Sequence, residues 1–135
     1  MLKFYTMAYD KMTNAEQLVA DFLKQNRIRW EFERPVVLLD DADRVRIWSP
    51  DYYLPELGVY VEVAASGNST SYEYRATVYN KNKIPVVFVN PYKQNDWEQW
   101  VITCLNSIHQ DRWEIIKSIK KSAAKSSGST VYKKW

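Results

Sequence analysis

One short segment restricts the fold of this chain more than any other. Residues 84–89 read Ile-Pro-Val-Val-Phe-Val, a compact apolar run typical of a buried strand. Residues 72–81, which precede it, have helical character, with Tyr72, Ala76 and Tyr79 on one side. A strand reached through a helical crossover pairs in parallel with an earlier strand. We therefore expect an α/β unit with a mixed sheet flanked by helices.

Three earlier segments have the character of strands. In residues 28–39, apolar and polar residues first alternate, and an apolar run follows. This pattern predicts one strand, with an interruption at Pro35 left open. After an aspartate-rich turn, residues 44–48 alternate again, which predicts a second, antiparallel strand that continues irregularly to residue 55. Residues 59–64 have strong β propensity and predict a third strand. These three strands form a meander, and residues 84–89 add a fourth.

Three further segments predict helices. Thr13 and Glu16 have capping-box spacing, so a helix should run from about residue 14 to residue 25. Asn95 and Glu98 repeat that spacing ahead of another helix, and a separate final helix should begin near Asp111. The predicted order is α-β-β-β-α-β-α-α. We expect one domain over residues 1–121 and a basic, low-complexity tail over residues 122–135.

Composition excludes several classes of protein. The chain has 135 residues, with one cysteine (Cys104) and one histidine (His109). A disulfide framework, a cysteine-cluster metal site and a multi-histidine zinc site are thereby excluded. No apolar run of 18 or more residues exists, and the N-terminus lacks a signal-peptide core. An intracellular protein that needs neither a membrane nor an organic cofactor is expected.

Positive charge is concentrated at the C-terminus. Residues 117–135 hold six lysines and no acid, whereas residues 1–116 carry a net charge of −3. Such a tail indicates a polyanionic partner, most often nucleic acid. A frayed end that only improves solubility is the alternative.

Two acidic residues form the most informative pattern. Asp51 follows Pro50 at a bend in one predicted strand, and Glu62 lies eleven residues later on the adjacent predicted strand. An antiparallel pair joined by a short turn brings both carboxylates to one point. Oxygen ligands of this kind suit Mg²⁺ or Mn²⁺.

The segment from Trp48 to Val63 resembles the core of the PD-(D/E)xK nuclease superfamily, which includes restriction enzymes and junction resolvases. The resemblance extends over roughly residues 14–105, where the predicted elements follow the superfamily's order. It implies a restriction-endonuclease-like α-β-β-β-α-β core, with extra C-terminal helices here, and metal-dependent cleavage of DNA. The motif is short, so its context carries the argument.

Four residues match the superfamily's metal site. The resemblance implies that Asp51 and Glu62 are catalytic metal ligands and that the carbonyl of Val63 is an additional ligand. Glu16 matches the acidic residue of the first helix, which completes the site in many members. Its capping-box position gives Glu16 an equally good structural role.

Position 64 departs from the pattern. The superfamily has a lysine two residues after the second acid, where it stabilises developing charge, but this chain has Ala64. The site is inactive, or the sequence is an engineered Lys-to-Ala form, or another cation substitutes. The candidate substitute is Arg75, four residues before Tyr79, because a guanidinium can clamp a phosphate. An exposed Arg75, paired with Glu73 or with solvent, is the alternative.

The leading expectation is a Mg²⁺- or Mn²⁺-dependent DNA endonuclease, for which a homodimer would allow both strands to be cut. An inactive nuclease-fold module that binds DNA, and a protein-interaction subunit with vestigial acids, are the alternatives. The expected DNA contacts are Arg75, Tyr79, Lys117, Lys120, Lys121 and Lys125.

Overall fold

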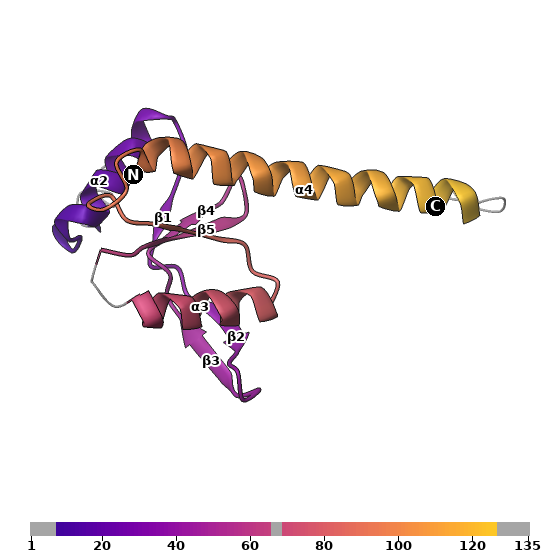
Figure 1. The fold of residues 1–135 in the computed structure, drawn as a ribbon, viewed down its shortest axis with the longest axis horizontal. Coiled ribbons are helices and arrows are strands. Elements are labelled where there is room, and N and C mark those ends of the chain that lie inside the picture. Colours follow the sequence, from indigo (N-terminus) through magenta and orange to yellow (C-terminus); the bar gives the residue numbers. More distant parts are fainter. Residues whose placement is uncertain (1–7, 66–68, 127–135) are drawn as a thin grey trace, which may run out of the picture.

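A mixed four-stranded sheet lies between two layers of helices in the computed structural model, which describes residues 8–65 and 69–126 (Figure 1). The strands are β1 (Glu31–Phe32), β4 (Tyr52–Leu54), β5 (Val59–Val63) and β6 (Val86–Val89), in the order β1-β4-β5-β6. Neighbouring strands are antiparallel except β5 and β6, which are parallel. The expectation of an α/β fold with a mixed four-stranded sheet is confirmed.

One face of the sheet packs against two helices, α2 (Asn14–Gln25) and α4 (Trp97–Ser126). Alternate residues of β5, namely Val59, Val61 and Val63, point into this core. Helix α2 begins at the predicted capping box, in which the Thr13 hydroxyl accepts from the Glu16 amide and the Glu16 carboxylate accepts from the Thr13 amide.

The opposite face of the sheet packs against α3 (Ser69–Lys81) and a separate two-stranded sheet. This second sheet pairs β2 (Val36–Leu39) with β3 (Val45–Trp48), and we call it the β2–β3 ribbon. Its inner face buries Leu38 against Val78 and Tyr79 of α3. Because side chains alternate along β5, Glu62 points toward this second layer, away from the valines on either side of it.

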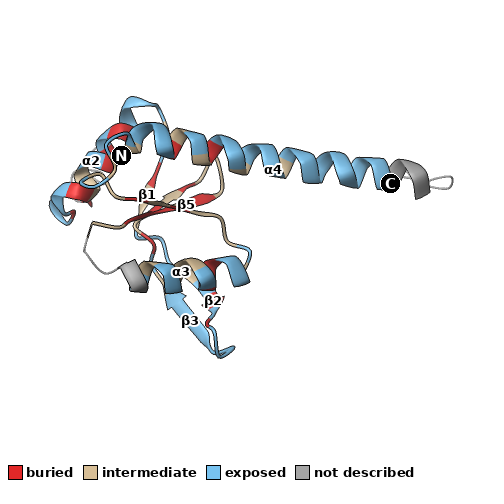
Figure 2. Ribbon diagram, in the orientation of Figure 1, coloured by how far each residue is buried: buried red, intermediate tan, exposed pale blue. Residues whose placement is uncertain are grey.

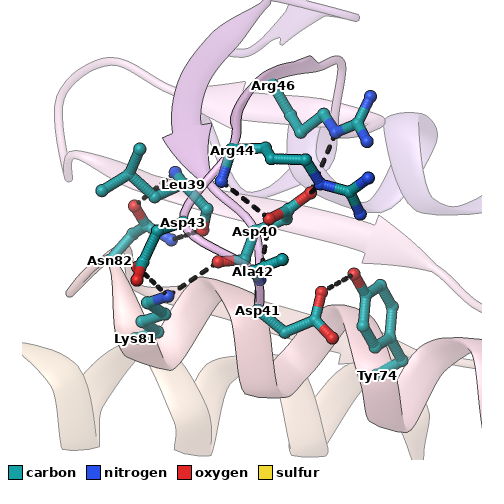
Figure 3. Close-up of polar contacts among 10 residues, drawn as sticks. All are labelled: Leu39, Asp40, Asp41, Ala42, Asp43, Arg44, Arg46, Tyr74, Lys81 and Asn82. Atoms are coloured by element: carbon teal, nitrogen blue, oxygen red, sulfur yellow. Dashed lines mark hydrogen bonds and ion pairs between the residues drawn. The ribbon is translucent and has the colours of Figure 1, made fainter.

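Polar contacts fix the β2–β3 ribbon to the C-terminal end of α3 (Figure 3). The side-chain amide of Asn82 donates to the Leu39 carbonyl and accepts from the Leu39 N–H, both over 2.8 Å. The Lys81 ammonium donates to the Asp40 carbonyl over 2.7 Å and pairs with the Asp43 carboxylate. Tyr74 adds a hydrogen bond to Asp41 over 2.8 Å.

The turn of the ribbon is organised by Asp40, whose side chain is only 3% exposed. Its carboxylate accepts from the backbone N–H groups of Ala42 and Arg44, and from the side chains of Arg44 and Arg46. The hydrogen bond from the Arg44 N–H is the largest influence that holds the pKa of Asp40 well below its usual range.

The predicted meander is wrong in detail. Residues 28–39 do not form one strand, because Glu33 adopts a left-handed conformation (φ 57°) ahead of Pro35, and the chain leaves the main sheet there. Residues 45–48 pair antiparallel to β2 as expected, but in the ribbon, outside the four-stranded sheet. The strand beside β5 is instead Tyr52–Leu54, in the segment expected to be irregular.

The two predicted C-terminal helices form one continuous helix, α4, which ends at Ser126. No glycine or proline occurs near residues 108–112, so nothing in the chain stops the helix there. The expected tail boundary at residue 122 therefore does not match the end of the helix, and residues 127–135 lie outside the described residues. Figure 2 shows that α4 is exposed from residue 113 to residue 122, whereas its first half includes the buried Val101 and Leu105.

Candidate functional site

Asp51 and Glu62 meet where β4 and β5 pair, as the sequence pattern predicted. The register sets Tyr52 opposite Val61, which places Asp51 beside Glu62. The Asp51 backbone N–H donates to Glu62 Oε1 over 3.2 Å, and the Val63 N–H donates to Asp51 Oδ2 over 2.7 Å. Each carboxylate is therefore held by the backbone of the other strand.

Glu62 is 4% exposed and receives its other partners from α3. Arg75 donates to Glu62 Oε2 from Nε over 2.8 Å and also from Nη2. The Tyr79 hydroxyl donates to the same oxygen over 2.9 Å, and Arg75 Nη2 donates to Tyr79 over 3.2 Å. The four-residue spacing of Arg75 and Tyr79 thus brings both onto the second acid of the pattern. The alternative of an exposed Arg75 paired with Glu73 or solvent is not what the structure shows.

Asp51 has an unusual electrostatic environment. Burial is the main cause that raises the pKa of its carboxyl group to about 8, and the charges of Glu62 and Glu16 add to the effect. A hydrogen bond with the Glu16 side chain contributes in the same direction. The three predicted acids therefore interact electrostatically, although they come from α2, from the residue before β4 and from β5.

Glu16 has a structural role at the start of α2. Its Oε1 accepts the Thr13 N–H over 2.8 Å in the capping box, and its charge adds to the raised pKa of Asp51. The capping-box role is therefore confirmed, and the metal-ligand role of Glu16 stays a prediction.

No pattern in the sequence predicts a site role for Trp48. The Arg75 guanidinium lies over the Trp48 ring, with its carbon 5.0 Å from the ring centroid. The same ring contacts Tyr79 edge-to-face, with centroids 5.3 Å apart. Trp48 of the β2–β3 ribbon therefore packs on both α3 residues that bind Glu62. Its position two residues before Pro50 was the available signal, but its alternation with apolar neighbours indicated a core residue.

Ala64 supplies no charge at the position of the superfamily's lysine. Its N–H donates to the Val89 carbonyl over 2.7 Å, which extends the parallel pairing of β5 and β6. The positive charge beside Glu62 comes instead from Arg75 on α3.

The donor atoms fit a hard divalent cation in their chemistry, since they are carboxylate oxygens. Their present arrangement is less favourable. Over residues 8–65 and 69–126, no group of three or more His, Cys, Asp or Glu side chains is arranged to hold a metal ion. In addition, Glu62 Oε2 already receives two donors from Arg75 and one from Tyr79. A cation at this oxygen would have to compete with Arg75.

The residues expected to bind DNA lie in two places. Arg75 and Tyr79 are in the site, whereas Lys117, Lys120 and Lys121 are exposed on the half of α4 that extends beyond the sheet (Figure 1). Lys125 lies in the same helix, but its side chain is outside the described part of the structure. The lysines are therefore separate from the acidic cluster.

Comparison of the chain with protein-family models, curated proteins and solved structures gave no match. Within residues 8–65 and 69–126, no helix has both the length and the apolar character that crossing a membrane requires.

Proposed function

We propose that this protein is a metal-dependent DNA endonuclease of the PD-(D/E)xK kind. The observation that carries the proposal is the pairing of Asp51 and Glu62, each hydrogen-bonded to the backbone beside the other, with the charges of Glu62 and Glu16 raising the pKa of the partly buried Asp51. A buried acid beside two other acids is unfavourable in its charged form, and a bound cation would relieve that cost.

The residues that would hold Mg²⁺ or Mn²⁺ are Asp51, Glu62, the Val63 carbonyl and Glu16. When bound, the ion supplies activation of a water molecule and stabilisation of charge on the scissile phosphate. The chain's own residues orient these ligands, because the backbone N–H groups of Asp51 and Val63 fix the two carboxylates.

Arg75 takes the place of the missing lysine in this proposal. A guanidinium stays protonated, so Arg75 serves as a phosphate clamp and not as a base. Trp48 supports one face of the guanidinium, which limits its orientations. Arg75 would exchange its bonds to Glu62 for bonds to a phosphate, which would leave Glu62 Oε2 available as a ligand.

A second candidate is a nuclease-fold module that binds DNA without cutting it. The saturation of Glu62 Oε2 by Arg75 and Tyr79 favours this candidate, since an acid held this firmly is a poor ligand. Either function would draw further affinity for phosphate from Lys117, Lys120, Lys121 and Lys125, and that affinity would weaken as salt rises.

The test is cleavage of supercoiled, single-stranded and four-way-junction DNA with Mg²⁺ and, separately, Mn²⁺. We expect the parent to cut at least one substrate and Asp51→Asn to lose that activity. Asp21→Asn is the matched control, because Asp21 is an exposed acid of α2 that bonds only Tyr9 among the contacts described here. Salt-dependent binding without cleavage would establish the second candidate. Neither binding nor cleavage would leave a protein-interaction subunit with vestigial acids.

A further inference from the structure

Helix α4 is longer than the domain beneath it. Its first half is anchored by the buried residues Val101 and Leu105 and by the partly buried Ile108. The last anchor is Arg112, whose guanidinium donates to the carbonyls of Leu57 and Gly58. Residues 113–126 continue past this point and project from the body (Figure 1). At 1.5 Å per residue, the projecting segment is about 21 Å long.

The apolar seam that anchors α4 does not stop where the body ends. Positions 101, 105, 108, 112, 115 and 119 alternate spacings of four and three, the heptad pattern of a helix that packs on another helix. On the projecting segment, residues 113–122 are exposed (Figure 2). The large apolar residues there, with their exposed fractions, are Trp113 (45%), Ile115 (58%), Ile116 (41%) and Ile119 (63%). An exposed apolar face of this kind favours association with another surface.

The charges on this segment indicate what covers it. Asp111 and Glu114 lie at the end near the body, and Lys117, Lys120 and Lys121 lie further out. Asp111 flanks the apolar seam, whereas Glu114, Lys117, Lys120 and Lys121 lie on the outer sides of the helix. Antiparallel alignment of two copies would still bring the acidic end of each nearest the basic end of the other, and parallel alignment would bring lysines nearest lysines. The charge gradient along the segment therefore favours a two-fold symmetric contact.

We propose that the protein forms a homodimer in which the projecting halves of α4 pair antiparallel, with Ile115 of each copy facing Ile119 of the other. The pairing covers the exposed apolar residues. It also brings the oppositely charged ends of the two copies closer together. It does not depend on the nuclease proposal, since it uses no residue of the acidic site.

The first experiment is sedimentation equilibrium of the full chain over a wide range of concentrations. We expect a reversible monomer–dimer equilibrium, which Ile115→Gln/Ile119→Gln weakens by about tenfold or more in dissociation constant. Glutamine keeps the helix propensity and removes only the apolar contact. The matched control is Val45→Gln/Ile47→Gln, which alters equally exposed residues of the β2–β3 ribbon and should leave the equilibrium unchanged. Circular dichroism of each variant checks that the helices are retained.

The second experiment tests the orientation. Asp111→Lys/Glu114→Lys should weaken the antiparallel dimer, and combining it with Lys120→Glu/Lys121→Glu should restore much of the lost affinity. A monomer at every concentration, or a dimer indifferent to the isoleucine substitutions, would overturn the proposal. A dimer that needs the isoleucines but ignores the charge exchange would overturn the antiparallel arrangement. If a glutamine variant unfolds, a melting temperature of the parent that does not rise with its concentration would still count against a dimer.

Discussion

Arg75 and Glu62 form an ion pair between α3 and β5, in which Arg75 Nε lies 2.8 Å from Glu62 Oε2. The glutamate side chain is 5% exposed and the arginine side chain 30% exposed. The pair therefore neutralises a buried acid from the more accessible side. It also places a cation beside the acid that the nuclease pattern assigns to a metal ion, so the same contact bears on stability and on the proposed metal binding.

Replacing this cation should weaken folding and strengthen metal binding. We expect Arg75→Gln to lower the free energy of unfolding by about 2 kcal/mol, because Glu62 keeps a buried charge with fewer partners. Mn²⁺ should then stabilise the variant more than the parent, since Glu62 Oε2 becomes accessible. Urea unfolding with and without Mn²⁺ measures both effects. The control is Arg34→Gln, which removes an exposed pair with Glu31 and a contact with the Tyr53 ring, and should change stability by less than about 1 kcal/mol. Equal responses to Mn²⁺ in variant and parent would contradict the expected competition.

The Tyr79 hydroxyl should be energetically coupled to Glu62. Tyr79 is 1% exposed, and its ring packs against Trp48 and Phe88, so Tyr79→Phe removes only the hydroxyl from a packed position. We expect a loss of about 1–2 kcal/mol. In a double-mutant cycle with Glu62→Gln, the two losses should not add. Tyr74→Phe, which removes an exposed hydrogen bond to Asp41, is the comparison and should have a smaller effect. Additive losses at Tyr79 and Glu62 would show that the hydrogen bond contributes nothing.

Asp51 should make stability fall as pH rises. Its folded pKa of about 8 lies above the ordinary value of 3.8, so the unfolded chain releases this proton first. Between about pH 4 and pH 8 the folded state binds more protons, and raising the pH favours unfolding. Asp51→Asn should therefore stabilise the protein by roughly 1–3 kcal/mol more at pH 8 than at pH 4. Denaturant unfolding at the two pH values gives the comparison, and a difference that does not vary with pH would rule out the raised pKa.

The β2–β3 ribbon should respond to pH in the opposite sense. Hydrogen bonds from Arg44, Arg46 and Ala42 hold the pKa of Asp40 below its ordinary value. Its stabilising effect is complete above about pH 4 and is lost as the pH falls further. In an acid titration followed by NMR, the amides of Ala42 and Arg44 should lose protection before that of Val61 in β5. In Asp40→Asn at neutral pH, amide exchange in the ribbon should accelerate by about tenfold or more while that of β5 is unchanged. Simultaneous loss of amide protection in the ribbon and in β5 would show that the ribbon does not unfold as an independent unit.

The local chemistry of the site could be predicted from the sequence more fully than the sheet. Asp51 and Glu62 belong to one hairpin, so their meeting needs only correct pairing of β4 and β5. Arg75 and Tyr79 are four residues apart on one helix, which keeps them on one face. The contact of both with Glu62 depends on the crossover to β6, which the apolar run at residues 84–89 revealed.

The predictions that were wrong concern features that depend on contacts between residues distant in sequence. Alternation at residues 44–48 is equally compatible with the main sheet and with a separate ribbon. Contacts of the ribbon with α3 and Asn82, which are distant in sequence, decide between the two. The left-handed backbone at Glu33, where the chain leaves the sheet, has no glycine or asparagine to signal it. Trp48 reads as a core residue because its partner Arg75 is a helix away.

Asn82 has a consequence for the behaviour of the ribbon in concentrated solution. Val37, Leu39, Val45 and Ile47 leave the ribbon with an exposed apolar surface, and such strands readily add a strand from another molecule. At Leu39, the outward N–H and carbonyl that would accept such a strand are both occupied by the Asn82 amide. One side chain thus imitates a neighbouring strand and blocks edge-to-edge polymerisation there. A chain with Asn82→Ala would be expected to fold and then to aggregate through β2.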